Sequence, residues 1–153
     1  MSKKVIASNR QAYHFYNILE TFEAGIVLSG NEVKSIRVNG ANLKEGFIRI
    51  VNGETYLHNV HIPQYKFYTI SDYEPAKKRK LLLNKREIKK IDGQLKTKGL
   101  AVVPLELYFN SRGYAKILLG LAKGKKLFDK RESIKKKDLS REMEREFKGK
   151  FKI

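Results

Sequence analysis

The dipeptide Asn52-Gly53 separates two short runs of strand-forming residues, 47–51 and 54–58. Asn-Gly readily adopts the positive φ angles of the two-residue turn that joins antiparallel strands. Between two such runs it is the strongest short-range signal for a β-hairpin. This segment therefore predicts antiparallel sheet and argues against an all-helical chain.

A second hairpin is predicted in the last third of the chain. Residues 100–109 form a strand-like run, residues 110–113 form a turn, and residues 114–122 return as the partner strand. Pro104 interrupts the first of these strands. Because proline donates no hydrogen bond to a neighbouring strand, we expect this one to be an edge strand or a bulged strand.

The first part of the chain predicts two short helices and one long strand. Asn9 is a suitable N-cap for a helix that extends to about Tyr16. Residues 16–28 show an imperfect strand alternation, in which Gly25 marks a bend or a bulge. A second helix starts at Gly30. Short antiparallel strands with about three helices predict a mainly β fold, a small barrel of the oligonucleotide-binding type.

The third helix is predicted inside a strongly basic segment. Asn84 is a good N-cap, and Glu87 follows three residues later, which is the spacing of a capping box. We expect a helix from Asn84 to about Thr97, with Gly99 placed for its C-terminal stop. Its apolar stripe consists of Ile88, Ile91 and Leu95.

Three consecutive leucines, Leu81, Leu82 and Leu83, precede this helix. Successive side chains of an extended backbone point in opposite directions. In one arrangement Leu81 and Leu83 face the core while Leu82 faces outward and packs on a base or ribose of an RNA. In the other arrangement all three leucines are core residues. The residue pattern leaves both open.

The formal net charge of +17 indicates a polyanionic partner. Nucleic acid is the first candidate, and an anionic membrane surface is the second. The chain has no cysteine, which excludes disulfides and thiolate metal sites, and we predict neither a metal site nor a cofactor. No apolar run approaches the roughly 18 residues of a membrane-spanning helix. The N-terminus does not resemble a signal peptide, so we expect a cytoplasmic protein.

The composition changes near the end of the second hairpin. We expect residues 1–122 to form the RNA-binding barrel and residues 123–153 to form a basic tail, disordered alone and helical on a partner. Few apolar residues occur in this tail, and those that share a helix face are Leu139, Met143 and Phe147. The cluster 123–126 links a barrel strand to Phe128, which favours contact with an RNA backbone.

Five short motifs occur along the chain in a specific order. They are EAGI at 23–26, GNEVKS at 30–35, RKLLLN at 79–84, AKGKK at 122–126 and DKR at 129–131. In this order, and over nearly the whole length, they resemble the small protein B (SmpB) family, the bacterial tmRNA-binding proteins of trans-translation. The resemblance implies an oligonucleotide-binding-type barrel with three helices and a tail that is unstructured in solution.

The resemblance also implies a function without catalysis. The family binds the tRNA-like domain of tmRNA and, with elongation factor Tu, delivers aminoacylated tmRNA to ribosomes stalled on messages lacking a stop codon. The body then occupies the place of a codon–anticodon pair. The tail enters the empty message channel and folds into a helix there.

Two sets of site residues follow from this resemblance. The predicted tmRNA contacts are the family matches Glu23, Leu82 and Asn84, together with the cations Lys34, Arg79 and Lys80 of the same motifs. The predicted contacts with the ribosome are Lys123, Gly124, Lys125, Lys126, Phe128, Asp129, Lys130 and Arg131. Phe128 stands where the family often has His or Tyr, so stacking is retained without a ring hydrogen bond.

Two other classes of protein fit part of the pattern. A structural ribosomal or general RNA-binding protein with this kind of fold is compatible with the composition. A nuclease or RNA-modifying enzyme would need a convergent acid–base or metal site, and none is recognisable in the sequence. A ribosomal protein should co-purify with all ribosomes, whereas a rescue factor should be enriched with tmRNA and with stalled ribosomes.

Overall fold

The computed structural model describes residues 3–67, 72–97 and 99–124. These ranges contain three helices: α1 (Arg10–Phe15), α2 (Gly30–Asn39) and α3 (Lys85–Leu95). They also contain the strands β1 (Lys4–Ser8), β2 (Tyr16–Ile26), β3 (Phe47–Val51), β4 (Glu54–His58), β5 (Arg79–Leu82), β6 (Leu100–Phe109) and β7 (Ala115–Gly124).

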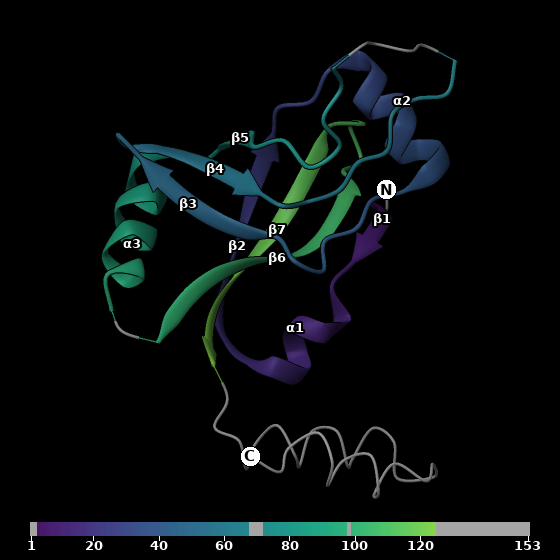
Figure 1. Cartoon of the computed structure of the whole chain (residues 1–153). Helices are drawn as coiled ribbons and strands as arrows, with labels where there is room; N and C mark the ends of the chain where they lie inside the picture. Colours follow the sequence, from purple (N-terminus) through teal and green to yellow (C-terminus); the bar gives the residue numbers. More distant parts are fainter. Residues whose placement is uncertain (1–2, 68–71, 98, 125–153) are drawn as a thin grey trace, which may run out of the picture.

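All these strands belong to one antiparallel sheet with the order β1-β6-β7-β2-β5-β4-β3 (Figure 1). The sheet curls far enough for β3 to pack against β6. Within the described residues no ladder joins the edge strands β1 and β3, so the sheet is an open, barrel-like one. The predicted mainly β architecture of oligonucleotide-binding type, with about three helices, is confirmed.

Both predicted hairpins are present. At the β3–β4 turn, Asn52 and Gly53 have φ angles of 52° and 76°, as a tight two-residue turn requires. At the β6–β7 turn, the Asn110 side chain accepts hydrogen bonds from the backbone N–H groups of Arg112 and Tyr114. Side-chain acceptors of this kind stabilise the turn independently of the rest of the fold.

The two expected strand irregularities have different outcomes. The expectation of an edge or bulged strand at Pro104 is confirmed as a bulge, which lies between Pro104 and Glu106 in a strand that pairs with both β1 and β7. Gly25 does not mark a bulge, because it pairs regularly with Leu82 and Lys116; the bulge of β2 lies between Ile18 and Glu20.

The capping box that starts α3 is confirmed. Asn84 Oδ1 accepts from the backbone N–H of Glu87 at 2.8 Å, and Glu87 Oε1 accepts from that of Asn84 at 3.3 Å. The helix ends at Leu95, two residues before the expected end, and Gly99 follows with a φ of 86°.

Asn9 occupies the N-cap position of α1, as expected, but its side chain makes no capping hydrogen bond, and the helix ends at Phe15. Asn9 is buried, and its amide nitrogen donates to the carbonyl oxygens of Leu43 and Pro104. A buried amide must be hydrogen-bonded, and these two carbonyls satisfy it.

The core lies inside the curl of the sheet. Alternate residues of β2 enter it, and α2 and α3 contribute Ile36 and Ile91, which are 1% and 0% exposed. Among the three leucines, Leu81 is 2% exposed, Leu82 is 55% exposed, and Leu83 packs against the core. The arrangement with Leu82 outward is therefore correct, and the all-core alternative is wrong.

No helix in the three described ranges is long and apolar enough to cross a membrane. Strand β7 continues through Lys123 to Gly124, beyond the predicted end of the body at residue 122. The predicted tail from residue 125 onward, with its stripe of Leu139, Met143 and Phe147, lies outside the described residues. The division of the chain into body and tail stays a prediction.

Candidate nucleic-acid interface

A row of residues crosses the solvent side of the sheet from one edge to the other. Strand pairing aligns Leu82, Gly25, Lys116, Tyr108 and Val5 on adjacent strands. Glu54, which precedes the partner of Leu81, and its own partner Val51 extend this row to the other edge. Paired residues share a face, and the chain neighbours of this row, such as Ile26, Leu81 and Ile117, are buried in the core. We call this set the outer row.

Gly25 allows Leu82 to lie across the outer row. The two residues are paired, and a Cβ atom at position 25 would lie 3.3 Å from Leu82 Cβ and 3.5 Å from its Cδ1. The glycine therefore makes room for the exposed leucine to lean over the sheet. An apolar side chain held in this way can pack on a ribose or a splayed base.

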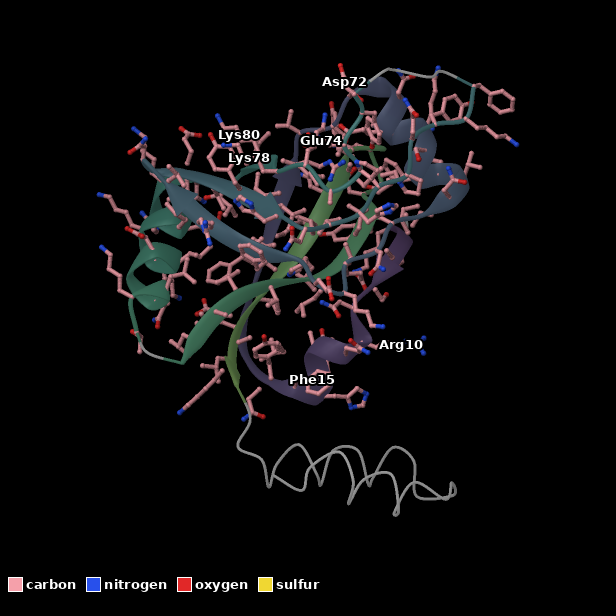
Figure 2. All side chains as sticks on the ribbon, viewed as in Figure 1. Arg10, Phe15, Asp72, Glu74, Lys78 and Lys80 are labelled. Atoms are coloured by element: carbon pink, nitrogen blue, oxygen red, sulfur yellow. The ribbon has the colours of Figure 1, made fainter. Side chains whose placement is uncertain are left out.

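Two exposed lysines, Lys78 and Lys80, precede Leu82 in the chain at alternate positions and lie close together in Figure 2. Lys80 Nζ is 2.8 Å from Glu54 Oε2, and Lys78 Nζ is 4.8 Å from the centroid of the Tyr56 ring. The hydrogen bond with Glu54 raises the pKa of the Lys80 ammonium group, which stays charged. Because this ion pair is exposed, it contributes little and can open toward a phosphate.

Glu23 lies two residues before Gly25 and on the same face of β2. It is exposed and accepts a hydrogen bond from the hydroxyl of Tyr108. Burial, followed by the hydrogen bond to Glu23, raises the pKa of Tyr108, so the phenol stays protonated. The predicted contact residue Glu23 thus has an intramolecular partner next to the outer row.

Asn84 lies two residues after Leu82, at the exposed N-terminus of α3. Exposed Lys85 and Arg86 follow in the first turn of the helix. The partial positive charge at a helix N-terminus and these two cations together favour an anion at this place. The structure therefore brings Glu23, Lys80, Leu82 and Asn84 to one region of the molecule.

Arg79 has a different environment from the one expected of an RNA contact. It is 3% exposed, and its Nε donates to Glu32 Oε2 at 2.7 Å. Its Nη atoms donate to the backbone carbonyls of Val60, Lys77 and Pro75. Every guanidinium nitrogen thus has an acceptor inside the protein, and we do not retain Arg79 as a direct RNA contact. The alternation that directs Leu82 outward also directs Arg79 inward with Leu81.

Lys34 belongs to a separate surface. It is exposed on α2, and its Nζ lies 5.9 Å from the centroid of the Tyr65 ring. Figure 1 shows α2 and α3 at opposite ends of the molecule. The structure does not bring Lys34 together with Leu82 and Asn84.

The predicted ribosome contacts fall mostly beyond the described residues. Lys123 and Gly124 are exposed at the end of β7, whereas Lys125, Lys126, Phe128, Asp129, Lys130 and Arg131 are not described. Lys123 follows Lys116 of the outer row by seven residues of strand, which corresponds to about 23 Å at the usual strand rise. Lys116 and Lys123, near the two ends of β7, therefore lie on different parts of the surface.

The sequence did not reveal Lys116 and Tyr108 as members of the interface. Strand alternation shows which residues share a face of one strand, but only the pairing of β7 with β2 and β6 places them beside Gly25. In the parts of the chain that the structure describes, no three His, Asp or Glu side chains gather as a metal site would require.

An open, curled antiparallel sheet whose outer face combines lysines with an exposed leucine, on a chain of charge +17, defines a small β-sheet protein that binds nucleic acid. The family model described as "SmpB protein" matches residues 6–149. This match covers most of the chain, which therefore belongs to the SmpB family.

Individual relatives agree with this assignment. The SsrA-binding protein of Elusimicrobium minutum is 55% identical over 97% of this chain and 94% of its own length. That of Sulfurihydrogenibium sp. (strain YO3AOP1) is 52% identical over the full length of both chains. A solved chain described as "tmRNA-SmpB: a journey to the center of the bacterial ribosome" is 48% identical, with a TM-score of 0.69 over 84% of this chain and 93% of that one.

Proposed function

We propose that this protein binds the tRNA-like domain of tmRNA and delivers it to ribosomes stalled on messages lacking a stop codon. The observation that carries the proposal is the full-length similarity, at about half of all positions, to proteins named for binding SsrA RNA. The protein acts as a binding factor in the cytoplasm, without catalysis or cofactor. Elongation factor Tu takes part through the aminoacylated tmRNA.

The outer row, with Glu23, Lys80 and Asn84, is the proposed surface for tmRNA. Between Leu82 and Tyr108 the row crosses three strand-to-strand steps, about 14 Å at the usual strand spacing. An apolar side chain among cations suits unpaired nucleotides, whose bases are exposed. It does not suit the deep, narrow major groove of an RNA duplex.

The far end of β7 is the proposed start of the ribosome-facing part. Lys123 and Gly124 lead into the cationic residues 125–131, which carry the family motif DKR. Phosphate contacts by such cations position a protein on RNA without reading its sequence. This assignment separates tmRNA binding in the sheet from ribosome engagement in the tail.

Sequencing the RNA that co-purifies with the protein tests the function. We expect strong enrichment of tmRNA over its share of total RNA. Equal recovery of ribosomal RNA from all ribosomes, without enrichment of tmRNA, would favour the alternative of a structural ribosomal protein.

A salt series on binding to the isolated tRNA-like domain tests the surface. The log–log slope should be about −0.7 to −0.9 per neutralised phosphate. Lys80→Gln should make this slope shallower by about one phosphate. Lys96→Gln is a matched control, because Lys96 is also exposed and paired with a carboxylate, that of Asp92, but lies at the other end of α3.

A further inference from the structure

Tyr108 is buried on the solvent side of the sheet. Its chain neighbours Leu107 and Phe109 belong to the core, so Tyr108 points away from the core, yet it is only 4% exposed. Lys3 covers it: Lys3 Nζ lies 4.6 Å from the ring centroid and 2.6 Å from Glu106 Oε1. This cover contributes to removing the phenol from solvent.

A buried phenol needs a hydrogen-bond acceptor. The hydroxyl of Tyr108 donates to Glu23 Oε2, across the strand β7 that separates β6 from β2. A carboxylate has about four acceptor positions on its two oxygens, so one bond to Tyr108 leaves the others available. Glu23 is exposed, and those positions face the side of the sheet where Leu82 and Lys116 lie.

We propose that Tyr108 is a positioning residue for RNA recognition, which holds the Glu23 carboxylate so that it accepts hydrogen bonds from the donor groups of an unpaired nucleotide. This inference rests on the proposed function. Phosphates carry no donor and are repelled by a carboxylate, whereas base N–H groups and ribose hydroxyls are donors. Glu23 therefore directs a base edge or a ribose, rather than the backbone, toward this part of the outer row.

The same geometry has a purely structural reading, in which Glu23 only satisfies the buried Tyr108. Two substitutions separate the readings. Tyr108→Phe removes the hydroxyl and keeps the ring under Lys3. Glu23→Gln keeps an acceptor oxygen for Tyr108 and removes the negative charge that a nucleotide donor would meet.

The experiment measures the dissociation constants of these variants and of the double variant for two polyanions. One is the tRNA-like domain of tmRNA, and the other is inorganic polyphosphate, which carries phosphate charge but no base or ribose donor. For the tRNA-like domain we expect Tyr108→Phe to weaken binding about tenfold, as for loss of a hydrogen bond to a charged group. Binding to polyphosphate and the salt slope should not change, because the phosphate contacts are intact. The double variant should bind no more weakly than Glu23→Gln.

Other outcomes overturn the inference. If Tyr108→Phe binds the tRNA-like domain as the unaltered protein does while Glu23→Gln loses affinity, Glu23 acts without Tyr108. If the tRNA-like domain and polyphosphate lose affinity equally and the melting temperature falls, the role of Tyr108 is structural. If Tyr108→Phe, Lys80→Gln and Leu82→Ala all leave binding of the tRNA-like domain unchanged, the proposed RNA surface itself is wrong. This outcome differs from the two above, in which at least one variant loses affinity.

Discussion

Arg79 and Glu32 form an ion pair in the interior: Arg79 Nη2 lies 2.7 Å from Glu32 Oε2, and the two side chains are 1% and 3% exposed. Glu32 also caps α2, because its Oε1 accepts from the backbone N–H of Ser29. The pair thus ties the start of β5 to the start of α2. Lys80 and Leu82, the outward residues of β5, are held in place by this inward contact.

We predict that Arg79→Gln lowers the free energy of unfolding by about 3–5 kcal/mol, because it leaves the buried Glu32 carboxylate with Lys77 alone as counter-charge, at 3.9 Å and from a partly exposed side chain. Urea denaturation measures this change. The control is Lys80→Gln, which removes an exposed cation and should leave the unfolding midpoint unaltered. An Arg79→Gln variant as stable as the control would show that the pair is not the internal tie described here.

A second prediction separates two adjacent leucines. Leu81→Ala should cost about 2–5 kcal/mol of stability, because Leu81 is almost completely buried. Leu82→Ala should leave stability nearly unchanged and weaken binding of the tRNA-like domain, because Leu82 is exposed on the outer row. Thermal melts and RNA titrations of both variants check this. Greater loss of stability in Leu82→Ala than in Leu81→Ala would contradict the assignment of faces.

A third prediction concerns the space above Gly25. Its φ is not positive, so a strand-forming side chain fits the backbone, but any Cβ there meets Leu82. Gly25→Val should displace Leu82 and lower affinity for the tRNA-like domain to the level of Leu82→Ala. Combining the two changes should add little, which a double-mutant cycle measures. Thr21→Val, on the same face of β2, is the control; independent, additive losses would argue against this contact.

A fourth prediction distinguishes the cap at Asn84 from its proposed contact with RNA. Asn84→Ala should destabilise the protein by about 1 kcal/mol through loss of the N-cap. Asn84→Asp keeps the cap acceptor and should keep the stability, but it replaces the amide donor with a negative charge. We therefore expect weaker tmRNA binding in both variants. Normal binding by Asn84→Asp would restrict Asn84 to its role in starting α3.

A fifth prediction tests the division into body and tail. A chain that ends after Leu127 keeps every described strand and should bind tmRNA nearly as well as the full chain. It should not support peptide transfer to alanyl-tmRNA on a stalled ribosome, because the tail residues that would order there are missing. Both activities are measured on the same preparation. Equal loss of both, or of neither, would show that the two tasks do not divide at this place.

Local chemistry was sufficient to predict the turns, the cap of α3 and the direction of Leu82. The Asn52-Gly53 turn, the Asn84–Glu87 capping box and the alternation along 81–83 all depend on residues within a few positions of each other. Interactions of this kind need only neighbouring residues, whereas the side chain of Asn9 binds carbonyls 34 and 95 residues away and does not cap α1. The motif order was equally sufficient for the family.

Long-range pairing determined which side chains lie together at the candidate interface. The sequence does not distinguish the cations Arg79 and Lys80 by charge, but the partner of Arg79 lies 47 residues away, and it draws the guanidinium inside. Tyr108 and Glu23 are 85 residues apart and meet only because β7 lies between β6 and β2. Contacts between distant residues depend on sheet order and on burial, and these arise only when the whole chain folds around one core.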